Sequence, residues 1–308
     1  MTGTPERTLD FFILGAQKAG SSWLAERLRN HPYVFLPKNE IHFFDVQRNY
    51  ERGLSWYLSH FCHAKPDQLL GEKTPSMYVV RADQKAQPIP QRLADHNPAL
   101  KFFVVLRDPV KRTQSALLHQ IWKGRLPATA SPFDLLFGTY ADRASHFGIL
   151  EQGLYYKQLV PFLETFPIER FRFYSFERDL MLSPAQTLAD AEAFLGLKQG
   201  YCTSGEDVRK RNRSVKSRTA LRWNSRFPRL GYLWQLYDRL NLSRDHLYLD
   251  ERLIQELRGY FREDTQRLER ELGLDLSHWR SASASNEGDP GVDPKADNPG
   301  HHQSSRSG

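Results

Sequence analysis

The stretch FFILGAQKAGSSWL, residues 11–24, joins a short apolar run to a glycine-flanked loop and then to a helical pattern. Residues 11–15 form a short, continuous apolar run of aromatic and aliphatic residues that ends in a glycine, which is typical of a buried strand. The helical pattern, residues 21–28, begins directly after Gly20. A strand, a loop and a helix start in this order direct several backbone N–H groups and the positive end of a helix dipole at one place. We therefore predict an anion-binding loop here.

Further runs of the same kind indicate a sheet. Buried strands are predicted at residues 33–36, 101–106 and 171–176, and helices at residues 110–122, 155–166 and 250–272. The last helix places five apolar residues on one side, namely Leu253, Leu257, Phe261, Leu268 and Leu272. Strands that alternate with helices predict an α/β fold, a three-layer sandwich with a central parallel sheet.

Composition sets the domain boundaries. The chain has 308 residues, 40% of them hydrophobic, which is enough for a sizeable core. After Trp279 the sequence turns to Ser, Asn, Gly, Asp and Pro, which cannot offset the entropy lost on ordering. We predict one domain over residues 1–280 and a disordered tail over residues 281–308.

The sequence also argues against several classes of protein. Its longest purely apolar run, residues 102–106, is far shorter than the roughly 20 residues of a membrane span, and no secretion signal is apparent before Lys18. Cys62 and Cys202 have neither zinc-ligand spacing nor the pattern of a disulfide framework. These features favour a cytoplasmic protein with no membrane span.

The loop departs from that of the nucleotide triphosphatases, G-x-x-x-x-G-K-[ST]. The spacing from Gly15 to Gly20 is kept, but Ser21 occupies the lysine position and Lys18 lies inside the loop. Lys18 is placed to contact a 5' phosphate, with Ser21 and Ser22 donating to its other oxygens. The alternative is a tight turn that carries a surface lysine.

The segment GAQKAGSS, residues 15–22, resembles the 5' phosphosulfate loop of the sulfotransferases, especially the branch related to the heparan sulfate enzymes. That branch usually has two threonines, or a threonine and a serine, where this chain has two serines, so both hydroxyls are kept. The resemblance implies a P-loop-like fold and 3'-phosphoadenosine 5'-phosphosulfate as co-substrate, with no metal. It assigns the 5' end of this nucleotide to Lys18, Ala19, Gly20, Ser21 and Ser22.

A second phosphate site is predicted at the end of the strand at residues 101–106. Arg107 follows this strand, Asp108 and Pro109 suit a helix start, and Ser115 lies two turns into that helix on the same side. The resemblance implies that Arg107 and Ser115 hold the 3' phosphate. The alternative is that Arg107 pairs with Asp108 or another carboxylate and that Ser115 lies on the helix surface.

The positive charge is concentrated in one place. Residues 207–229 contain nine Lys or Arg and one acid, a local charge of +8, so the rest of the chain sums to −1 against the total of +7. In the resembling family a basic loop late in the chain covers the nucleotide, which implies binding by Lys210, Arg211 and Arg213. Alternatives are a solvated surface or a nucleic-acid site, and we predict no nucleic-acid partner.

Residues 36–45 resemble the Lys-Glu-x-His-Phe-Phe-Asp segment of the heparan-type enzymes, whose glutamate is the general base. By position, Glu40 would take the acceptor's proton. His42 is the competing base, because its ordinary pKa suits the task. A purely structural alternative pairs Glu40 with Lys38 and His42 with a backbone carbonyl.

Residues 71–75 resemble the family's Glu-Lys-Thr-Pro stretch, whose lysine lies close to the transferring sulfate. Lys73 would then stabilise developing negative charge. The alternative is an exposed lysine in a turn at Pro75.

Taken over residues 9–280, the resemblance predicts in-line transfer of a sulfuryl group to a hydroxyl of a carbohydrate, a lipid or a natural product, with carbohydrate favoured. Two other functions stay open at this stage. One is phosphotransfer from ATP, which the missing lysine after Gly20 and the presence of Arg107 in place of a magnesium-binding carboxylate disfavour. The other is nucleic-acid binding through the basic patch.

Overall fold

The computed structural model describes residues 7–75, 88–202, 215, 217–239 and 247–281. The chain divides into two compact units, Met1–Leu274 and Asp275–Gly308. The predicted domain boundary after residue 280 stays a prediction, since the predicted tail lies almost wholly outside the described residues. In the second unit the described residues form the short helix α14 (His278–Ser281).

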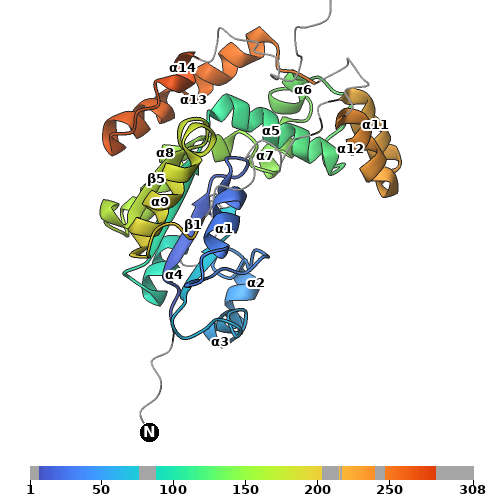
Figure 1. Cartoon of the computed structure of the whole chain (residues 1–308). Helices are drawn as coiled ribbons and strands as arrows, with labels where there is room; N and C mark the ends of the chain where they lie inside the picture. Colours follow the sequence, from blue (N-terminus) through green and yellow to red (C-terminus); the bar gives the residue numbers. More distant parts are fainter. Residues whose placement is uncertain (1–6, 76–87, 203–214, 216, 240–246, 282–308) are drawn as a thin grey trace, which may run out of the picture. The chain divides into compact units, whose positions relative to one another are not determined.

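The first unit is built on a parallel sheet of five strands in the order β2-β3-β1-β4-β5 (Figure 1). The strands are β1 (Phe11–Gly15), β2 (Val34–Phe35), β3 (Leu69–Lys73), β4 (Lys101–Leu106) and β5 (Phe171–Ser175). The predicted α/β fold with a parallel sheet is therefore confirmed. β5 ends one residue before the predicted position, because Ser175 caps a π-helical turn that begins at Phe176 and accepts a hydrogen bond from the backbone N–H of Arg178.

Strand β3 was not predicted, and the alternative that placed Lys73 in a turn is wrong. Its sequence, LLGEK, mixes a glycine and two charges, so it lacks the apolar continuity that marks the other strands. Gly71 is required because the ring of Phe11 on β1 occupies the space where its side chain would stand. Glu72 is almost fully buried, yet two hydroxyl groups donate to its carboxylate, which makes its burial tolerable.

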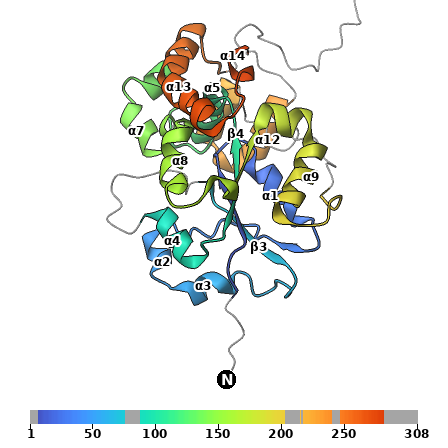
Figure 2. The same ribbon diagram turned by 90° about the vertical axis from the view of Figure 1, so that its left-hand side faces the viewer.

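Helices cover both faces of the sheet. Consecutive side chains of a strand point to opposite faces, and the consecutive apolar residues of β4 are therefore buried on both. On one face, Phe102 of β4 contacts Phe162 of α8 (Tyr155–Leu163). On the other face, Phe103 contacts Phe194 of α9 (Pro184–Leu195), which packs beside α1 (Ser21–Arg29). Figure 2 shows α8 on one side of the sheet and α1 with α9 on the other. This arrangement is the predicted three-layer sandwich.

The remaining helices complete the unit. They are α2 (Gln47–Tyr50), α3 (Leu54–Ser59), α4 (Ile89–His96), α5 (Pro109–Trp122), α6 (Pro132–Leu136), α7 (Ala141–His146), α11 (Arg218–Arg226), α12 (Gly231–Arg239) and α13 (Glu251–Leu272). The predicted helices correspond to α1, α5, α8 and α13, although α8 ends three residues earlier than predicted. Asp250 caps α13 through the backbone N–H of Leu253. Four of the five residues predicted to face inward on α13 are buried, whereas Leu272 is only half-buried.

Candidate active site

The phosphate loop, Arg107 and Lys73 lie at the carboxyl edge of the sheet. From β1 the chain proceeds to β2 on one side of the sheet, and from β3 it crosses to β4 on the other side of β1. In open α/β sheets such a reversal marks the ligand-binding position, the crevice outside the carboxyl ends of the strands on either side of it. The loop after β1 and Arg107 after β4 lie at this position.

The conformation of the loop at residues 15–20 requires a glycine at position 20. Gly20 has a φ of 98°, and a side chain there would stand 2.8 Å from carbon atoms of Phe176 and of Leu180. Lys18 also has a positive φ, 68°. The guanidinium of Arg107 donates from Nη1 to the carbonyl oxygen of Lys18 at 3.0 Å. The two predicted phosphate-binding elements are therefore in direct contact.

A second arginine, which was not predicted from the sequence, holds the loop through hydrogen bonds. Arg112 of α5 is fully buried and donates to the carbonyl oxygen of Gln17 at 3.2 Å and to Oε1 of Gln152 at 3.1 Å. Burial, followed by repulsion from Arg107 and Arg112, lowers the pKa of the Lys18 ammonium. Three cations thus gather at the crevice. Their mutual repulsion makes it a site at which a bound anion is favoured.

Arg107 is held by contacts that leave part of its guanidinium available. Its Nε lies 3.9 Å from Oε1 of Glu177, and the ring of Phe176 lies 4.8 Å from the guanidinium carbon. This Nε is buried and, within the described part of the chain, has no hydrogen-bond partner. Asp108 instead caps α5, accepting from the backbone N–H of Val110 at 2.9 Å.

Ser115, the second residue predicted to hold the 3' phosphate, lies half-buried in α5, eight residues after Arg107. The three basic residues predicted to cover the nucleotide, Lys210, Arg211 and Arg213, lie outside the described residues.

The acceptor-side residues form a chain of contacts with the phosphate loop. Lys73 Nζ lies 2.6 Å from Oε1 of Glu40 and 3.4 Å from Oγ of Ser22. Lys73 is the last residue of β3, so its side chain leaves the sheet at the same edge as the loop. The partner of Glu40 is therefore a lysine 33 residues away, not the neighbouring Lys38.

His42 lies between two carboxylates. Its Nδ1 lies 2.9 Å from Oδ2 of Asp45, and its Nε2 lies 3.4 Å from Oε2 of Glu40. Hydrogen bonding to Asp45, and then to Glu40, raises the pKa of His42 to about 10. Burial alone would raise the pKa of Glu40, but its hydrogen bonds with His42 and Lys73 outweigh this effect and lower it. At neutral pH, Glu40 is ionised and His42 is protonated.

Asp45 ends the motif quoted above, yet its contact with His42 was not predicted. Its offset of three residues from His42 was the one local signal that could have suggested the pair.

Glu72 precedes Lys73 in β3, and its side chain is buried. The hydroxyls of Tyr57 and Thr74 donate to its two oxygens at 2.6 Å and 2.7 Å. Burial raises its pKa to about 7. Near neutrality this carboxyl group therefore carries a fraction of a charge.

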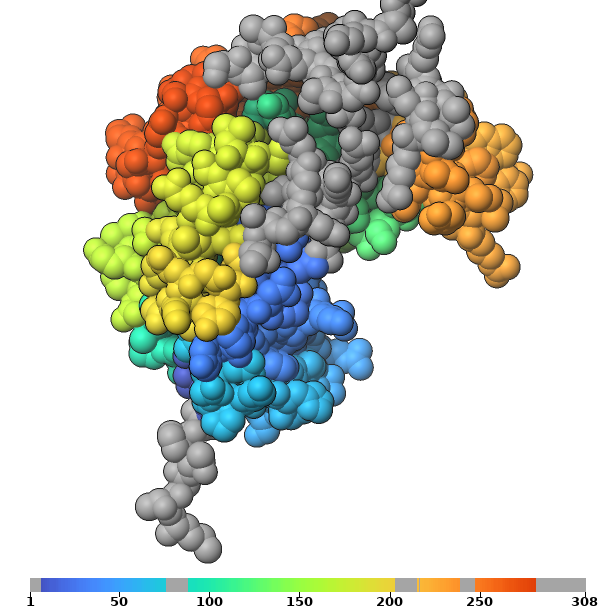
Figure 3. Space-filling model, in the orientation of Figure 1, coloured from blue at the N-terminus to red at the C-terminus, as the bar shows by residue number. Residues whose placement is uncertain are grey.

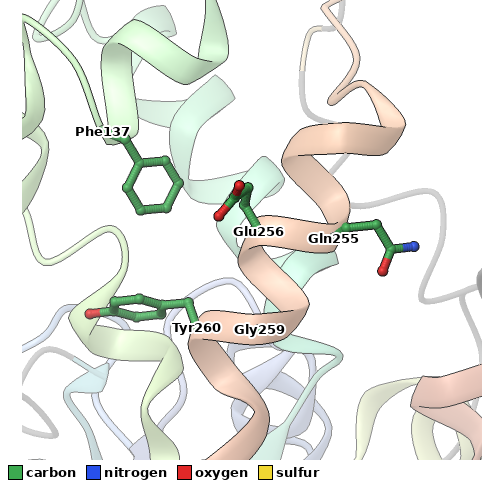
Figure 4. A pocket seen from close by; sticks show the side chains of 5 residues that line it. All are labelled: Phe137, Gln255, Glu256, Gly259 and Tyr260. Carbon is green, nitrogen blue, oxygen red and sulfur yellow. The ribbon is translucent and has the colours of Figure 1, made fainter.

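A hollow of about 440 Å³ lies elsewhere, between the end of α6 and the α13 helix. Figure 4 shows its lining, which consists of Phe137, Gln255, Glu256, Gly259 and Tyr260. None of these five residues belongs to the phosphate loop or to the Glu40–Lys73 pair, so this hollow is separate from the predicted chemistry. Across the described ranges, no three His, Cys, Asp or Glu side chains are grouped so that they could hold a metal ion. Among the helices described, none has both the length and the apolar character that crossing a bilayer requires.

The parallel sheet with a phosphate-type loop after its first strand defines a P-loop-like α/β protein. Residues 8–226 match the family model described as Sulfotransferase domain, and the chain belongs to this family. The resemblance stated from the sequence is thereby confirmed.

Two relatives illustrate the similarity at the level of sequence. The chain is 36% identical over 192 residues to heparan sulfate glucosamine 3-O-sulfotransferase 3B1 of Mus musculus, a match that covers 61% of this chain and 46% of the relative. It is 38% identical over 189 residues to heparan sulfate glucosamine 3-O-sulfotransferase 6 of Homo sapiens, covering 61% of this chain and 52% of the relative. The match thus spans about half of the length of these relatives.

A solved structure agrees on the fold. The crystal structure of a sulfotransferase from Alicyclobacillus acidocaldarius aligns with a TM-score of 0.66 at 23% identity, covering 89% of this chain and 100% of that one.

Proposed function

We propose that this protein transfers a sulfuryl group from 3'-phosphoadenosine 5'-phosphosulfate to an acceptor hydroxyl. Membership of the sulfotransferase family supports the reaction type. The observation that carries the proposal is the position of Lys73, whose ammonium contacts both Glu40 and Ser22. One cation thereby joins the proposed base to the loop proposed to hold the sulfate donor.

The donor would lie along the crevice with its two phosphates at separate positions. Lys18, with the backbone and hydroxyl groups of residues 19–22, would bind the 5' phosphosulfate at the start of α1. Arg107 and Ser115 would bind the 3' phosphate, to which the partly exposed guanidinium of Arg107 would supply charged donors. The cation surplus at Lys18, Arg107 and Arg112 supports this placement, because a bisphosphorylated nucleotide would neutralise it.

In the proposed reaction, the acceptor oxygen forms a bond to sulfur as the bond between sulfur and the phosphate oxygen breaks. The products are a sulfate ester and adenosine 3',5'-bisphosphate. Glu40 takes the hydroxyl proton, Lys18 neutralises the departing phosphate, and Lys73 stabilises the sulfuryl oxygens. The low pKa of Glu40 is compatible with this role, because the hydroxyl becomes strongly acidic only as its oxygen bonds to sulfur. His42 is protonated and serves as a support for Glu40.

A carbohydrate hydroxyl is the proposed acceptor, ahead of a lipid or natural-product hydroxyl. The support is that the relatives described above are named for the glucosamine of heparan sulfate. The cytoplasm is the proposed location, because Cys62 and Cys202 are both free thiols.

Calorimetry with adenosine 3',5'-bisphosphate and with adenosine 5'-monophosphate tests the donor site. We expect tight binding of the first and binding weaker by at least about tenfold of the second, since a charged hydrogen-bonded contact is worth roughly 1.5–3 kcal/mol. Transfer from labelled donor to a panel of heparan oligosaccharides, lipids and phenols then identifies the acceptor class. Equal binding of the two nucleotides, or ATP consumption that EDTA abolishes, would contradict the proposal.

A further inference from the structure

Helices α11 and α12 carry a cluster of apolar side chains that faces solvent. Of fifteen large apolar side chains that are exposed among the described residues, six lie between positions 223 and 236. We call these six the α11–α12 surface: Trp223, Phe227, Leu230, Tyr232, Leu233 and Leu236. Figure 1 locates the helix pair and Figure 3 shows its surface in orange. Scattered exposed apolar residues are ordinary, but a cluster of this kind marks an interaction site.

The inner side of α11 already packs against the rest of the unit. Ala220 and Leu221 are fully buried, and the side chain of Asn224 donates to the carbonyl oxygen of Trp122 on α5 at 2.7 Å. The helix pair is therefore anchored to α5, and the α11–α12 surface is distinct from the side that packs on the core of the same unit. On the outer side, the ring of Trp223 stacks on those of Phe227 and Trp234 at 5.7 Å and 5.8 Å.

Arginines border this apolar surface. Arg222, Arg226 and Arg229 are exposed, and residues 218–239 contain five arginines against one acid, Asp238. The carboxylate of Asp238 accepts from the backbone N–H of Ser217. Arg226 follows Trp223 by three residues, so a cationic and an apolar side chain are neighbours on the exposed part of α11.

This chemistry discriminates between possible partners. A polyanion in solution would pair with the arginines but would leave the exposed leucines in water. A second copy of this chain would cover the leucines but would bring like charges together across a symmetric contact. An anionic bilayer satisfies both groups, because aromatic and leucine side chains enter the interface while arginines meet the headgroups.

We propose that the α11–α12 surface docks the protein peripherally on a membrane rich in anionic lipids. The binding does not depend on sulfuryl transfer, and it requires no spanning helix. A cytoplasmic leaflet provides such a surface, since its negative potential attracts clustered basic residues.

Sedimentation with vesicles tests this proposal. One set is made of equal parts phosphatidylcholine and phosphatidylglycerol, and the other of phosphatidylcholine alone. We expect the full chain to bind the first set, to bind the second on the order of tenfold more weakly, and to dissociate from the first as salt is raised.

Two double variants separate the apolar and the charged contributions. Tyr232→Ser with Leu233→Ser, and Arg226→Gln with Arg229→Gln, change only exposed side chains, so the fold should be kept, which circular dichroism verifies. Each is expected to weaken binding to the anionic vesicles by about tenfold or more. The matched controls, Leu182→Ser and Arg262→Gln, alter exposed residues elsewhere and should bind like the unmodified chain.

Three results would overturn the inference. The first is equal binding of the double variants and the controls to the anionic vesicles. The second is no vesicle binding together with a dimer, detected by ultracentrifugation, that the Tyr232→Ser and Leu233→Ser changes dissociate. The third is no vesicle binding together with retention on heparin that the arginine variant loses, which would assign the surface to a soluble polyanion.

Discussion

Replacing Glu40 by glutamine removes the proposed base with almost no change of shape. A general base contributes roughly 10²- to 10⁴-fold to a rate. At 1.36 kcal/mol for each factor of ten, this is about 3–5 kcal/mol of transition-state stabilisation. The fold should tolerate the change, because glutamine keeps the size of the side chain and its amide oxygen can still accept from the ammonium of Lys73.

His42 should not rescue the Glu40→Gln variant. The histidine loses one carboxylate partner but keeps Asp45 at 2.9 Å, which maintains its protonated form near neutral pH. We therefore expect kcat to fall by roughly 10²- to 10⁴-fold. Calorimetry should give an affinity for adenosine 3',5'-bisphosphate within about threefold of the unmodified value. Glu51→Gln is the matched control, since Glu51 is exposed and contacts only Gln47 among the described side chains.

The pH dependence of turnover is a second test of which residue is the base. Because the pKa of Glu40 is lowered from its ordinary value, the acid limb of the wild-type profile should lie below the pKa of an ordinary glutamate. An acid limb far above that value, toward the raised His42 pKa of about 10, would instead identify His42 as the base. Turnover within threefold of wild type in Glu40→Gln would refute the reasoning, as would a parallel loss of nucleotide affinity.

Three other changes test separate parts of the site. Arg107→Ala should lower the affinity for adenosine 3',5'-bisphosphate by roughly 10- to 100-fold and leave adenosine 5'-monophosphate almost unaffected, with the half-exposed Arg178→Ala as control; an equal loss for both nucleotides would contradict a role at the 3' phosphate. Glu72→Gln should flatten the dependence of unfolding free energy on pH. Because the folded pKa of Glu72 is raised, its contribution to stability is fully present below pH 4.5 and is lost as pH rises through about 7, a change of about 3 kcal/mol. Denaturation at pH 5 and pH 8 measures this change, and an equal change of unfolding free energy in both proteins would contradict the raised pKa of Glu72. Nucleotide binding should be accompanied by proton uptake in alkaline buffer, because the anion raises the lowered pKa of Lys18, and calorimetry in buffers of different ionisation enthalpy would reveal its absence.

The parts of the fold that the sequence predicted are those encoded locally. β1 and β4 are uninterrupted apolar runs, and the helices that follow them begin with local signals, Gly20 before α1 and Asp108 with Pro109 at the start of α5. β3 was missed because burial of Glu72 in a strand depends in part on a hydrogen bond from Tyr57, which lies 15 positions earlier, in the helix α3. No local pattern reports that contact.

The same distinction applies to the candidate site. The phosphate loop is contiguous, so its residues could be predicted together. The pairing of Glu40 with Lys73 could not, because it depends on the order of strands in the sheet; the partner considered from the sequence, as an alternative, was Lys38. The sequence favoured Glu40 over His42 through the resemblance alone. The hydrogen bond between His42 and Asp45, which was not predicted, moves the pKa of His42 away from the value that made histidine attractive as a base.

The contacts of Lys73 also suggest how donor binding and catalysis are coupled in the proposed reaction. The ammonium contacts Glu40 at 2.6 Å and Ser22 at 3.4 Å, so the proposed base is held in an ion pair. Sulfuryl oxygens placed next to Ser22 would compete with Glu40 for the same ammonium. As Lys73 moves toward them, the carboxylate loses its lysine partner and becomes a better proton acceptor. The base would therefore be strengthened only when the donor is in place, which favours binding of the nucleotide before proton removal from the acceptor.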